Sequence, residues 1–350
     1  MEPLISVIMP VFNGENVVER AIRSVLEQTF QSWELLIIDD CSTDHTVEVI
    51  KRWTDKDSRI RLFCQEKNYG PGAAKNRGLI CAKGDYITFC DADDWIDREA
   101  FQILVDNTEG KYDTVVSGFY RDIIEQDGKL LERTIVKMNA FTCTNKIDVL
   151  KNIIELDQNR LFSYAVNKLF KRKIIENNKV YFSDKKFGED FDFNIDFFRH
   201  VDNMKVIDQG FYHYVKQNRE SLTERYIPNF YEINRERFEK INRLMIDSGC
   251  YTKMVRQKIM SLYVKHVSAA IARLYDPRGG LSWKERRRKT KDILKNDFSR
   301  KAALDAFSKK RSEIICNMVF KTRNVTINLI YGYLLWFMQT KGKKLYEKIK

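Results

Sequence analysis

The sequence has 350 residues, of which 43% are hydrophobic and 31% are charged, and it carries a formal net charge of +12. This length suits one large globular domain or a domain with an extension, and no low-complexity segment or repeat interrupts it. The excess of positive charge predicts anionic partners, namely nucleotide phosphates, anionic lipid or nucleic acid.

Two features of the sequence concern the compartment. The seven cysteines are scattered, and none forms a CxxC or Cys/His pair with zinc spacing, so we expect free thiols in a reducing environment. Met1-Glu2-Pro3 has no basic region, and the apolar stretch after it is too short and strand-like for a signal peptide. We therefore expect a cytoplasmic protein.

Alternating strands and helices are predicted for the first 90 residues. The predicted strands cover residues 4–13, 34–38, 60–64 and 85–90, and the predicted helices cover residues 15–29, 44–53 and 73–82. Pro10 is expected to stop the first strand, and a Gly70-Pro71-Gly72 turn precedes the third helix. Short connections between alternating strands and helices predict a parallel sheet with helices on both faces.

The predicted strand at residues 85–90 leads directly into Asp91-Ala92-Asp93-Asp94. Three carboxylates so close together repel one another unless a cation lies among them, and hard oxygen ligands suit Mg²⁺ or Mn²⁺. The carboxyl edge of an open α/β sheet is also where such folds bind ligands. The alternative is a solvated acidic turn that caps the helix after Trp95.

Four pieces of this region, in the same order and spacing, resemble family 2 glycosyltransferases. They are Ser6-Val7-Ile8-Met9-Pro10-Val11-Phe12-Asn13, Ile38-Asp39-Asp40-Cys41-Ser42-Thr43-Asp44, Asn76-Arg77-Gly78 and Asp91-Ala92-Asp93-Asp94. The resemblance implies an α/β protein with the GT-A fold, a Rossmann-like and mostly parallel central sheet with flanking helices. It also implies a nucleotide-sugar donor, for which a UDP-sugar is expected.

The resemblance further implies roles for single residues. Asp40 would accept a hydrogen bond from the uracil N3–H, with Asp39 beside it or capping the following helix. Asp93 would bind Mn²⁺ or Mg²⁺, while Asp91 would bind the ribose or reach the metal through water. Asp94 would belong to the same acidic loop, and the alternative for it is a cap of the next helix. The complete expected nucleotide-binding set is Pro10, Val11, Asn13, Glu15, Asp39, Asp40, Arg77, Asp91 and Ala92, in which Arg77 meets the uracil or phosphates unless it forms a surface ion pair.

Two later segments extend the resemblance to about residue 225. Gly188-Glu189-Asp190 opens a predicted helix that runs to about residue 200, and it resembles the family's ED element. This implies that Asp190 is the general base and that Glu189 positions it or contacts the acceptor; the alternative is an acidic first turn that suits the helix dipole. The segment 212–223 implies that His213 joins the metal, whereas the alternative is a packed, hydrogen-bonded histidine.

The remaining predicted elements are less diagnostic. Between the acidic triplet and the ED element we expect a helix at 97–107, a strand at 112–119, a hairpin at 120–136 around Asp127-Gly128, a helix at 146–156 and another after Arg172. We predict a catalytic domain at residues 1–227 and a helical, basic region at 228–350.

The carboxy-terminal region contains long helical patterns at 229–247 and 251–275, a basic stretch at 283–291 and an apolar stretch at 325–338. The apolar stretch is shorter than the ~20 residues that span a bilayer. Its Tyr331, Tyr333 and Trp336, and the lysines after residue 340, suit a helix that lies in the membrane interface. The alternatives are a core helix or a homo-oligomer contact.

These observations together predict an inverting, metal-dependent glycosyltransferase of the hexosyl- or N-acetylhexosaminyl class. Its acceptor would be a hydroxyl of a capsule, cell-wall or lipid-linked glycan. The alternative is a non-catalytic sugar-nucleotide or polysaccharide-binding protein of the same fold. A dehydrogenase is disfavoured because Pro10-Val11-Phe12-Asn13-Gly14 replaces the glycine-rich turn, and no nucleic-acid-binding motif is present.

Overall fold

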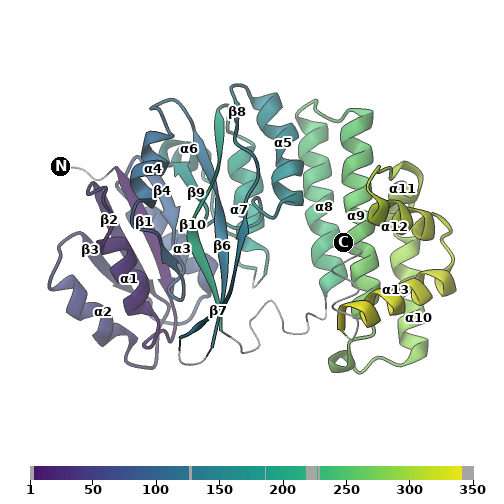
Figure 1. Ribbon diagram of the computed structural model, residues 1–350, viewed down its shortest axis with the longest axis horizontal. Helices are drawn as coiled ribbons and strands as arrows, with labels where there is room; N and C mark the ends of the chain where they lie inside the picture. Colours follow the sequence, from purple (N-terminus) through teal and green to yellow (C-terminus); the bar gives the residue numbers. More distant parts are fainter. Residues whose placement is uncertain (1–3, 126–127, 186, 218–226, 228, 341–350) are drawn as a thin grey trace. The chain divides into compact units, whose positions relative to one another are not determined.

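The computed structural model describes residues 4–125, 128–185, 187–217, 227 and 229–340 (Figure 1). The chain divides into two compact units, residues 1–221 and 222–350. The predicted limits of 1–227 and 228–350 stay a prediction, because the junction falls among residues outside the described ranges. The terminal lysines after residue 340 and residues 218–223 also lie outside the described ranges, so the predictions about them stay predictions.

The first unit is built on one sheet, in which the described residues form ten strands. The strand order is β3-β2-β1-β4-β9-β6-β10-β5, with β7 paired to β6 and β8 paired to β10. The bounds are β1 (Ile5–Val11), β2 (Trp33–Asp39), β3 (Ile60–Cys64), β4 (Tyr86–Phe89), β5 (Trp95–Ile96), β6 (Thr114–Ile124), β7 (Leu130–Val136), β8 (Phe141–Cys143), β9 (Lys168–Lys171) and β10 (Met204–Gln217).

Strands β1 to β4 are parallel to one another, and β10 is parallel to β6. Every residue of β2 and β4 is buried, which explains why both strands read as continuous apolar runs rather than alternating ones. Because the four parallel strands point the same way, the loops after β1, β2 and β4 meet at one edge of the sheet. The predicted α/β fold class is confirmed.

Seven helices flank the sheet in the described part of this unit. They are α1 (Val18–Leu26), α2 (Thr46–Thr54), α3 (Pro71–Cys81), α4 (Ala100–Asp106), α5 (Lys146–Gln158), α6 (Arg172–Asn178) and α7 (Glu189–Phe198). Helix α3 lies unusually close to β1, since a Cβ on Gly78 would stand 2.4 Å from the Ile8 Cγ2 atom. This contact fixes the helix that carries Lys75 against the strand that leads to the site.

Three details of single elements differ from the prediction. Strand β1 continues through Pro10 to Val11, so the proline does not stop it. The helix expected at 97–107 is present as α4, which begins at Ala100, but the short strand β5 before it, paired with β10, was not predicted. Strand β9, inserted antiparallel between β4 and β6, was not predicted. The predicted hairpin does pair β6 with β7, although Asp127 lies outside the described residues.

The second unit is helical throughout its described residues. Its helices are α8 (Phe230–Asp247), α9 (Lys253–Arg273), α10 (Trp283–Lys295), α11 (Asp297–Asp305), α12 (Arg311–Lys321) and α13 (Val325–Thr340), with a 3-10 turn at Pro277–Gly279. Helix α9 is buried on most sides because α8, α11, α12 and α13 all pack against it. Among the described helices, none is long and apolar enough to cross a bilayer.

Candidate active site

The acidic loop after β4 is fixed by strand β10. Asp94 is fully buried, and its carboxylate accepts hydrogen bonds from the Tyr212 hydroxyl and from the Val215 N–H, the latter at 2.8 Å. The Tyr212 hydroxyl oxygen also accepts from the Asp91 N–H at 3.2 Å. Asp94 therefore ties the acidic loop to β10, and its expected role as a helix cap is wrong.

The other two carboxylates of the loop differ in exposure. Asp93 is exposed, and its backbone oxygen accepts from the Arg20 guanidinium. Burial raises the pKa of Asp91 to about 6. The positive charge of Lys75 lowers this pKa, whereas the negative charges of Asp190 and Asp93 raise it further. Asp91 is thus a carboxylate with excess negative charge around it, which a cation at this edge of the sheet would relieve.

The predicted base is held by a buried lysine of α3. The Lys75 Nζ atom lies 2.6 Å from Asp190 Oδ1 and 3.9 Å from Glu189 Oε1, and only 3% of the Lys75 side chain is exposed. Burial opposes the charge of Lys75, but the carboxylates around it raise its pKa above the ordinary value. The structure therefore brings Asp190, Glu189 and Asp91 together around one cation.

Glu189 is the more perturbed member of the predicted pair. Burial raises the pKa of Glu189 to about 7, and the neighbouring Asp190 adds to the rise while Lys75 opposes it. Asp190 takes the shorter contact with Lys75, at 2.6 Å against 3.9 Å for Glu189. Asp190 is therefore the carboxylate of the pair that Lys75 holds in position, as a general base requires.

A short loop gives Asp190 its second contact. The Ala165 N–H donates to Asp190 Oδ2 at 3.2 Å. The loop itself is held by buried Lys168, whose Nζ donates to the Leu161 and Tyr164 carbonyl oxygens at 2.6 and 2.5 Å. Asn194 of α7 donates to the Tyr164 carbonyl at 3.2 Å from the other side. The position of Asp190 thus depends on both α3 and this loop.

The loop after β1 braces the loop after β2. Asn13, at a φ of 50°, donates its N–H to Ser42 Oγ at 2.9 Å and accepts from the Thr43 N–H at 2.8 Å. Glu15 accepts from the His45 N–H at 3.0 Å. The side chains of Asn13 and Glu15, which were predicted to hold the nucleoside, already have partners in the neighbouring loop.

The two carboxylates at the end of β2 have different surroundings. Asp40 accepts from the Tyr69 and Gly70 N–H groups at 2.8 and 2.7 Å and from Gln65 at 2.6 Å. Asp39 is 2% exposed and accepts from the Ser42 N–H through Oδ2, whereas its Oδ1 has no partner among the described residues. Asp39 therefore has an oxygen that can still accept a hydrogen bond, whereas both oxygens of Asp40 already accept one or more.

The remaining predicted nucleotide-binding residues surround these loops. Val11 and Ala92 are buried, Pro10 is half-buried, and Arg77 is exposed with its guanidinium carbon 5.9 Å from the Phe63 ring centroid. Pro10 and Val11 pair with Ile38 and Asp39 in the sheet. Pro10 and Val11 can meet a nucleotide only at the strand end, while Arg77 can reach outward.

His213 lies in a sandwich of aromatic rings. Its ring stacks on Trp95 at 3.5 Å between centroids and on Tyr120 at 4.7 Å. Nδ1 lies 2.8 Å from Asp122 Oδ2 and Nε2 lies 3.1 Å from Asp97 Oδ1. Both ring nitrogens are therefore engaged, and metal binding by His213 stays a prediction that requires one of these contacts to be exchanged.

The described residues contain no group of three or more His, Cys, Asp or Glu side chains that could hold a metal ion. The carboxylates of Asp91 and Asp93 are hard oxygen donors and fit Mg²⁺ or Mn²⁺ chemically. A divalent ion there would need further ligands from a bound diphosphate or from water, as Mg²⁺ usually does.

Sequence reasoning missed three residues that organise this site. Lys75 and Lys168 are buried lysines on α3 and β9. Asp122 lies between His213 and Arg133 of β7, whose Nε donates to Asp122 Oδ1 at 2.7 Å. For Lys75 a signal was present, because it lies beside Ala74 and Leu79 on the buried side of α3. For Lys168 and Asp122 the sequence offered none.

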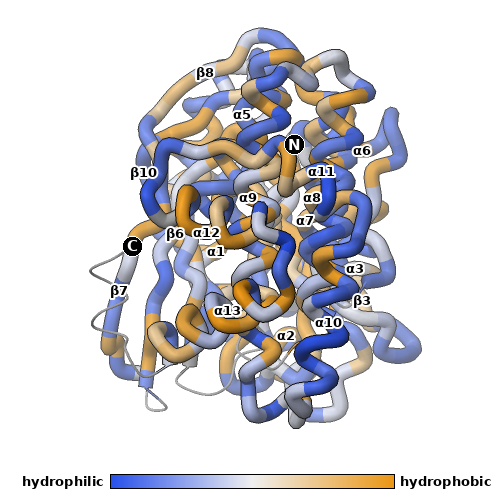
Figure 2. The backbone as a smooth tube through the Cα atoms, turned by 90° about the vertical axis from the view of Figure 1, so that its right-hand side faces the viewer, coloured by the Kyte–Doolittle hydropathy of each residue, from blue (hydrophilic) through white to orange (hydrophobic). Residues whose placement is uncertain are grey.

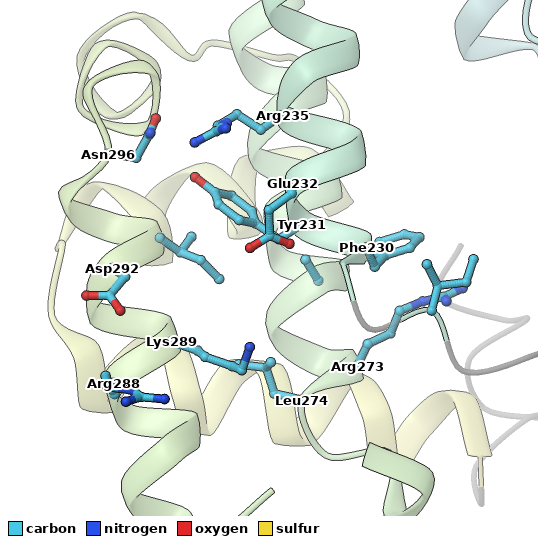
Figure 3. Close-up of a pocket in the computed structure, with 13 residues that line it drawn as sticks. Phe230, Tyr231, Glu232, Arg235, Arg273, Leu274, Arg288, Lys289, Asp292 and Asn296 are labelled. Atoms are coloured by element: carbon cyan, nitrogen blue, oxygen red, sulfur yellow. The ribbon is translucent and has the colours of Figure 1, made fainter. Parts of the chain in front are cut away.

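The second unit has a pocket of its own, with a volume of about 400 Å³ (Figure 3). Arg235 and Glu232 of α8 and Arg288, Lys289 and Asp292 of α10 are among its lining side chains. It combines both signs of charge and contains none of the predicted site residues. The candidate active site is therefore the cluster at the sheet edge of the first unit.

Comparison with known proteins decides the family. Residues 6–178 match the model of the family described as Glycosyl transferase family 2. The chain is 32% identical over 228 residues to the "Uncharacterized glycosyltransferase EpsJ" of Bacillus subtilis, a match that covers 64% of each chain. Residues 6–178 therefore form a glycosyl transferase family 2 domain.

Two further comparisons are with Staphylococcus aureus proteins. The Staphylococcus aureus poly(ribitol-phosphate) beta-N-acetylglucosaminyltransferase TarP is 31% identical over 223 residues, which cover 62% of this chain and 64% of TarP. The crystal structure of S. aureus TarS 1-349 in complex with UDP-GlcNAc superposes with a TM-score of 0.67 and 18% identity, covering 98% of this chain and 92% of that one. The TarS match confirms the GT-A fold, and the chain spans about two thirds of EpsJ and TarP.

Proposed function

We propose that the protein transfers a sugar from a nucleotide-sugar donor to a hydroxyl group of a cell-surface glycan or lipid-linked acceptor. The observation that carries the proposal is the cluster in which Lys75 and the Ala165 N–H hold Asp190 beside the acidic loop. A general base must be fixed in position and close to the donor's leaving group. The contacts of Asp190 with Lys75 and Ala165 support the first property, and its electrostatic interaction with Asp91 of the acidic loop supports the second.

In the proposed reaction Asp190 accepts the proton of the acceptor hydroxyl as its oxygen attacks the anomeric carbon. Attack from the face opposite the leaving diphosphate inverts the anomeric centre. Glu189, whose raised pKa favours the protonated form near neutrality, would donate a hydrogen bond to the acceptor or to Asp190. Because Lys75 neutralises part of the acid cluster, it would keep Asp190 in place in the free enzyme.

The donor is proposed to be a UDP-sugar. The free Oδ1 of Asp39 supports a contact with the uracil N3–H, a role that the resemblance gave to Asp40. Asp91 and Asp93 would hold Mn²⁺ or Mg²⁺, which supplies a Lewis acid for the departing diphosphate. TarS binds UDP-GlcNAc in its crystal structure, which supports the same class of donor here.

The names of similar proteins support the proposed acceptor class, and the cysteines support the proposed compartment. TarP acts on poly(ribitol-phosphate), and a teichuronic acid biosynthesis glycosyltransferase is also similar to this chain. These names support a capsule or cell-wall polymer as the product. All seven cysteines are unpaired, which supports a reducing, cytoplasmic setting where nucleotide sugars are available.

The test is release of UDP from a panel of UDP-sugars, with and without bacterial cell-wall acceptors. Asp190→Asn keeps the shape of the side chain and removes its proton affinity, so transfer should fall by ~10²–10⁴-fold while donor binding stays nearly unchanged. Asp208→Asn, an exposed change on β10, is the matched control. Activity of Asp190→Asn within about tenfold of wild type would reject Asp190 as the base.

The alternative function, a binding protein without turnover, makes a different prediction. Such a protein would bind the UDP-sugar but release no UDP with any acceptor. Isothermal titration together with the release assay separates the two functions.

A further inference from the structure

The last two described helices present an exposed apolar face. Its members are 43–65% exposed: Ile315 and Met318 of α12, and Ile327, Ile330, Leu334 and Phe337 of α13. The α13 members follow one another at intervals of three and four residues, so they lie on one side of the helix. We call these six residues the apolar face; Figure 2 colours much of α13 as hydrophobic.

The other side of α13 already has a partner within the second unit. Leu329 is fully buried, and a Cβ on Gly332 would stand 2.7 Å from Ile271 of α9. The Tyr275 hydroxyl donates to the Leu329 carbonyl at 3.1 Å. Helix α13 is thus anchored by one side, and the core-helix alternative accounts for Leu329 and Gly332 but not for the apolar face.

The exposed charges of the segment that carries the apolar face have a single sign. Between residues 306 and 340 the basic side chains are Lys309, Lys310, Arg311, Lys321 and Arg323, all of them exposed. The one acid of this segment, Glu313, is 4% exposed and lies 3.5 Å from Ser261 Oγ. The exposed charged side chains of residues 306–340 are therefore all basic.

We propose that the apolar face and its five cations form a docking surface for an anionic lipid bilayer. The helices would lie in the plane of the interface, with the apolar side chains in the acyl boundary and the cations among the lipid headgroups. Tyr333 and Trp336, whose ring centroids lie 5.8 Å apart, add aromatic side chains of the kind that favour this depth.

Charge complementarity favours a membrane over a second copy of the chain. A symmetric contact would place the same patch on both partners, and so would bring two rims of lysine and arginine together. An anionic bilayer instead supplies the opposite charge over the whole face. This inference does not depend on the transferase activity, and its test does not use it.

The experiment is flotation of the full chain with vesicles of phosphatidylcholine alone or with 30 mol% phosphatidylglycerol, a composition of roughly the anionic content that attracts basic segments. We expect the protein to float with the anionic vesicles at low salt, and to dissociate at high salt. Ile330→Asn with Leu334→Asn should remove binding, while Lys321→Gln with Arg323→Gln should weaken it by roughly tenfold or more at low salt.

Matched controls remove the same kinds of side chain elsewhere. Ile246→Asn with Met254→Asn removes two exposed apolar groups of the second unit, and Lys151→Gln with Lys173→Gln removes two exposed lysines of the first. Both controls should float like wild type, and circular dichroism should show all variants folded. Wild-type protein that stays unbound at low salt would overturn the proposal.

A second outcome would also overturn it. If the wild type is a dimer by light scattering and Ile330→Asn with Leu334→Asn makes it monomeric, the apolar face is a contact between copies. Turnover of a water-soluble acceptor should be the same in all these variants, so failure of the docking proposal would leave the proposed function intact.

Discussion

Asp93 differs from its neighbours because its side chain is exposed at the site edge. Its replacement should therefore leave the free energy of unfolding within about 0.5 kcal/mol of wild type. Asp93→Ala should nonetheless abolish donor turnover that depends on Mn²⁺ or Mg²⁺, because the carboxylate is the most accessible hard ligand. Asp55→Ala, a change at the exposed residue directly after α2, is the control. Full activity of Asp93→Ala in the presence of a chelator would rule out the metal assignment.

Glu189 links pH to stability. Burial raises its pKa in the folded protein to about 7, against 4.5 for an ordinary glutamate, so the folded state binds this proton more tightly than the unfolded state does. Proton binding by Glu189 therefore stabilises the folded protein. This stabilisation is fully present below pH 4.5 and is lost as the pH rises through 7. The total loss is on the order of 1–3 kcal/mol.

Glu189→Gln should remove this pH dependence, since glutamine stays neutral. The melting temperature of the variant, relative to wild type, should rise between pH 5 and pH 8.5. Glu66→Gln, at an exposed position, should show no such trend. A Glu189→Gln difference that is the same at both pH values would mean that Glu189 is not the group that titrates near neutrality.

At the scale of elements, the base depends on a contact between α3 and α7. Lys75 carries a buried charge, and removing one partner of a buried ion pair leaves the other uncompensated. Lys75→Met should lower the free energy of unfolding by about 3 kcal/mol and reduce transfer. Lys83→Met, an exposed change just after α3, is the control. Chemical denaturation measures the effect, and an unchanged midpoint would show that the pair contributes nothing.

The loop between α5 and β9 is the second element on which the base depends. Lys168→Met removes three hydrogen bonds that hold this loop, including one to Asn167 Oδ1 at 2.8 Å. We expect kcat to fall by roughly tenfold or more with little change in donor KM, because the base and not the donor site is displaced. Lys173→Met is the exposed control on α6. A rise in donor KM with unchanged kcat would contradict this role.

At the scale of the whole molecule, the sequence predicted the elements that have strong periodicity. Strand β3 and helices α8 and α9 lie within one or two residues of their predicted bounds, because their apolar patterns match what they bury. The short strands β5 and β9 could not be predicted, since tertiary pairing rather than local preference creates them. Lys168 is a fully buried lysine in β9, a residue that no propensity places there.

In the site, too, residues in local motifs could be predicted and their tertiary partners could not. Motifs along the chain predicted Asp91, Asp93, Asp190 and their neighbourhood, because each lies at the end of a recognisable strand or the start of a helix. The partners of these residues could not be predicted, since Lys75 meets Asp190 across 115 positions of sequence. Only the fold shows that Asp40 is already bound by the Tyr69–Gly70 backbone and that His213 faces two carboxylates.

The bonds of Asp94 to β10 have a consequence for the growing chain. Its partners Tyr212 and Val215 follow it by 118 and 121 positions. At ~5–20 residues per second, a ribosome needs roughly 6–25 s to add them after Asp94 has been made. During that interval the nascent chain gains β9, the last strand that pairs with β1 or β4, but the acidic loop still lacks its anchor. Donor binding should therefore begin only after strand β10 leaves the exit tunnel.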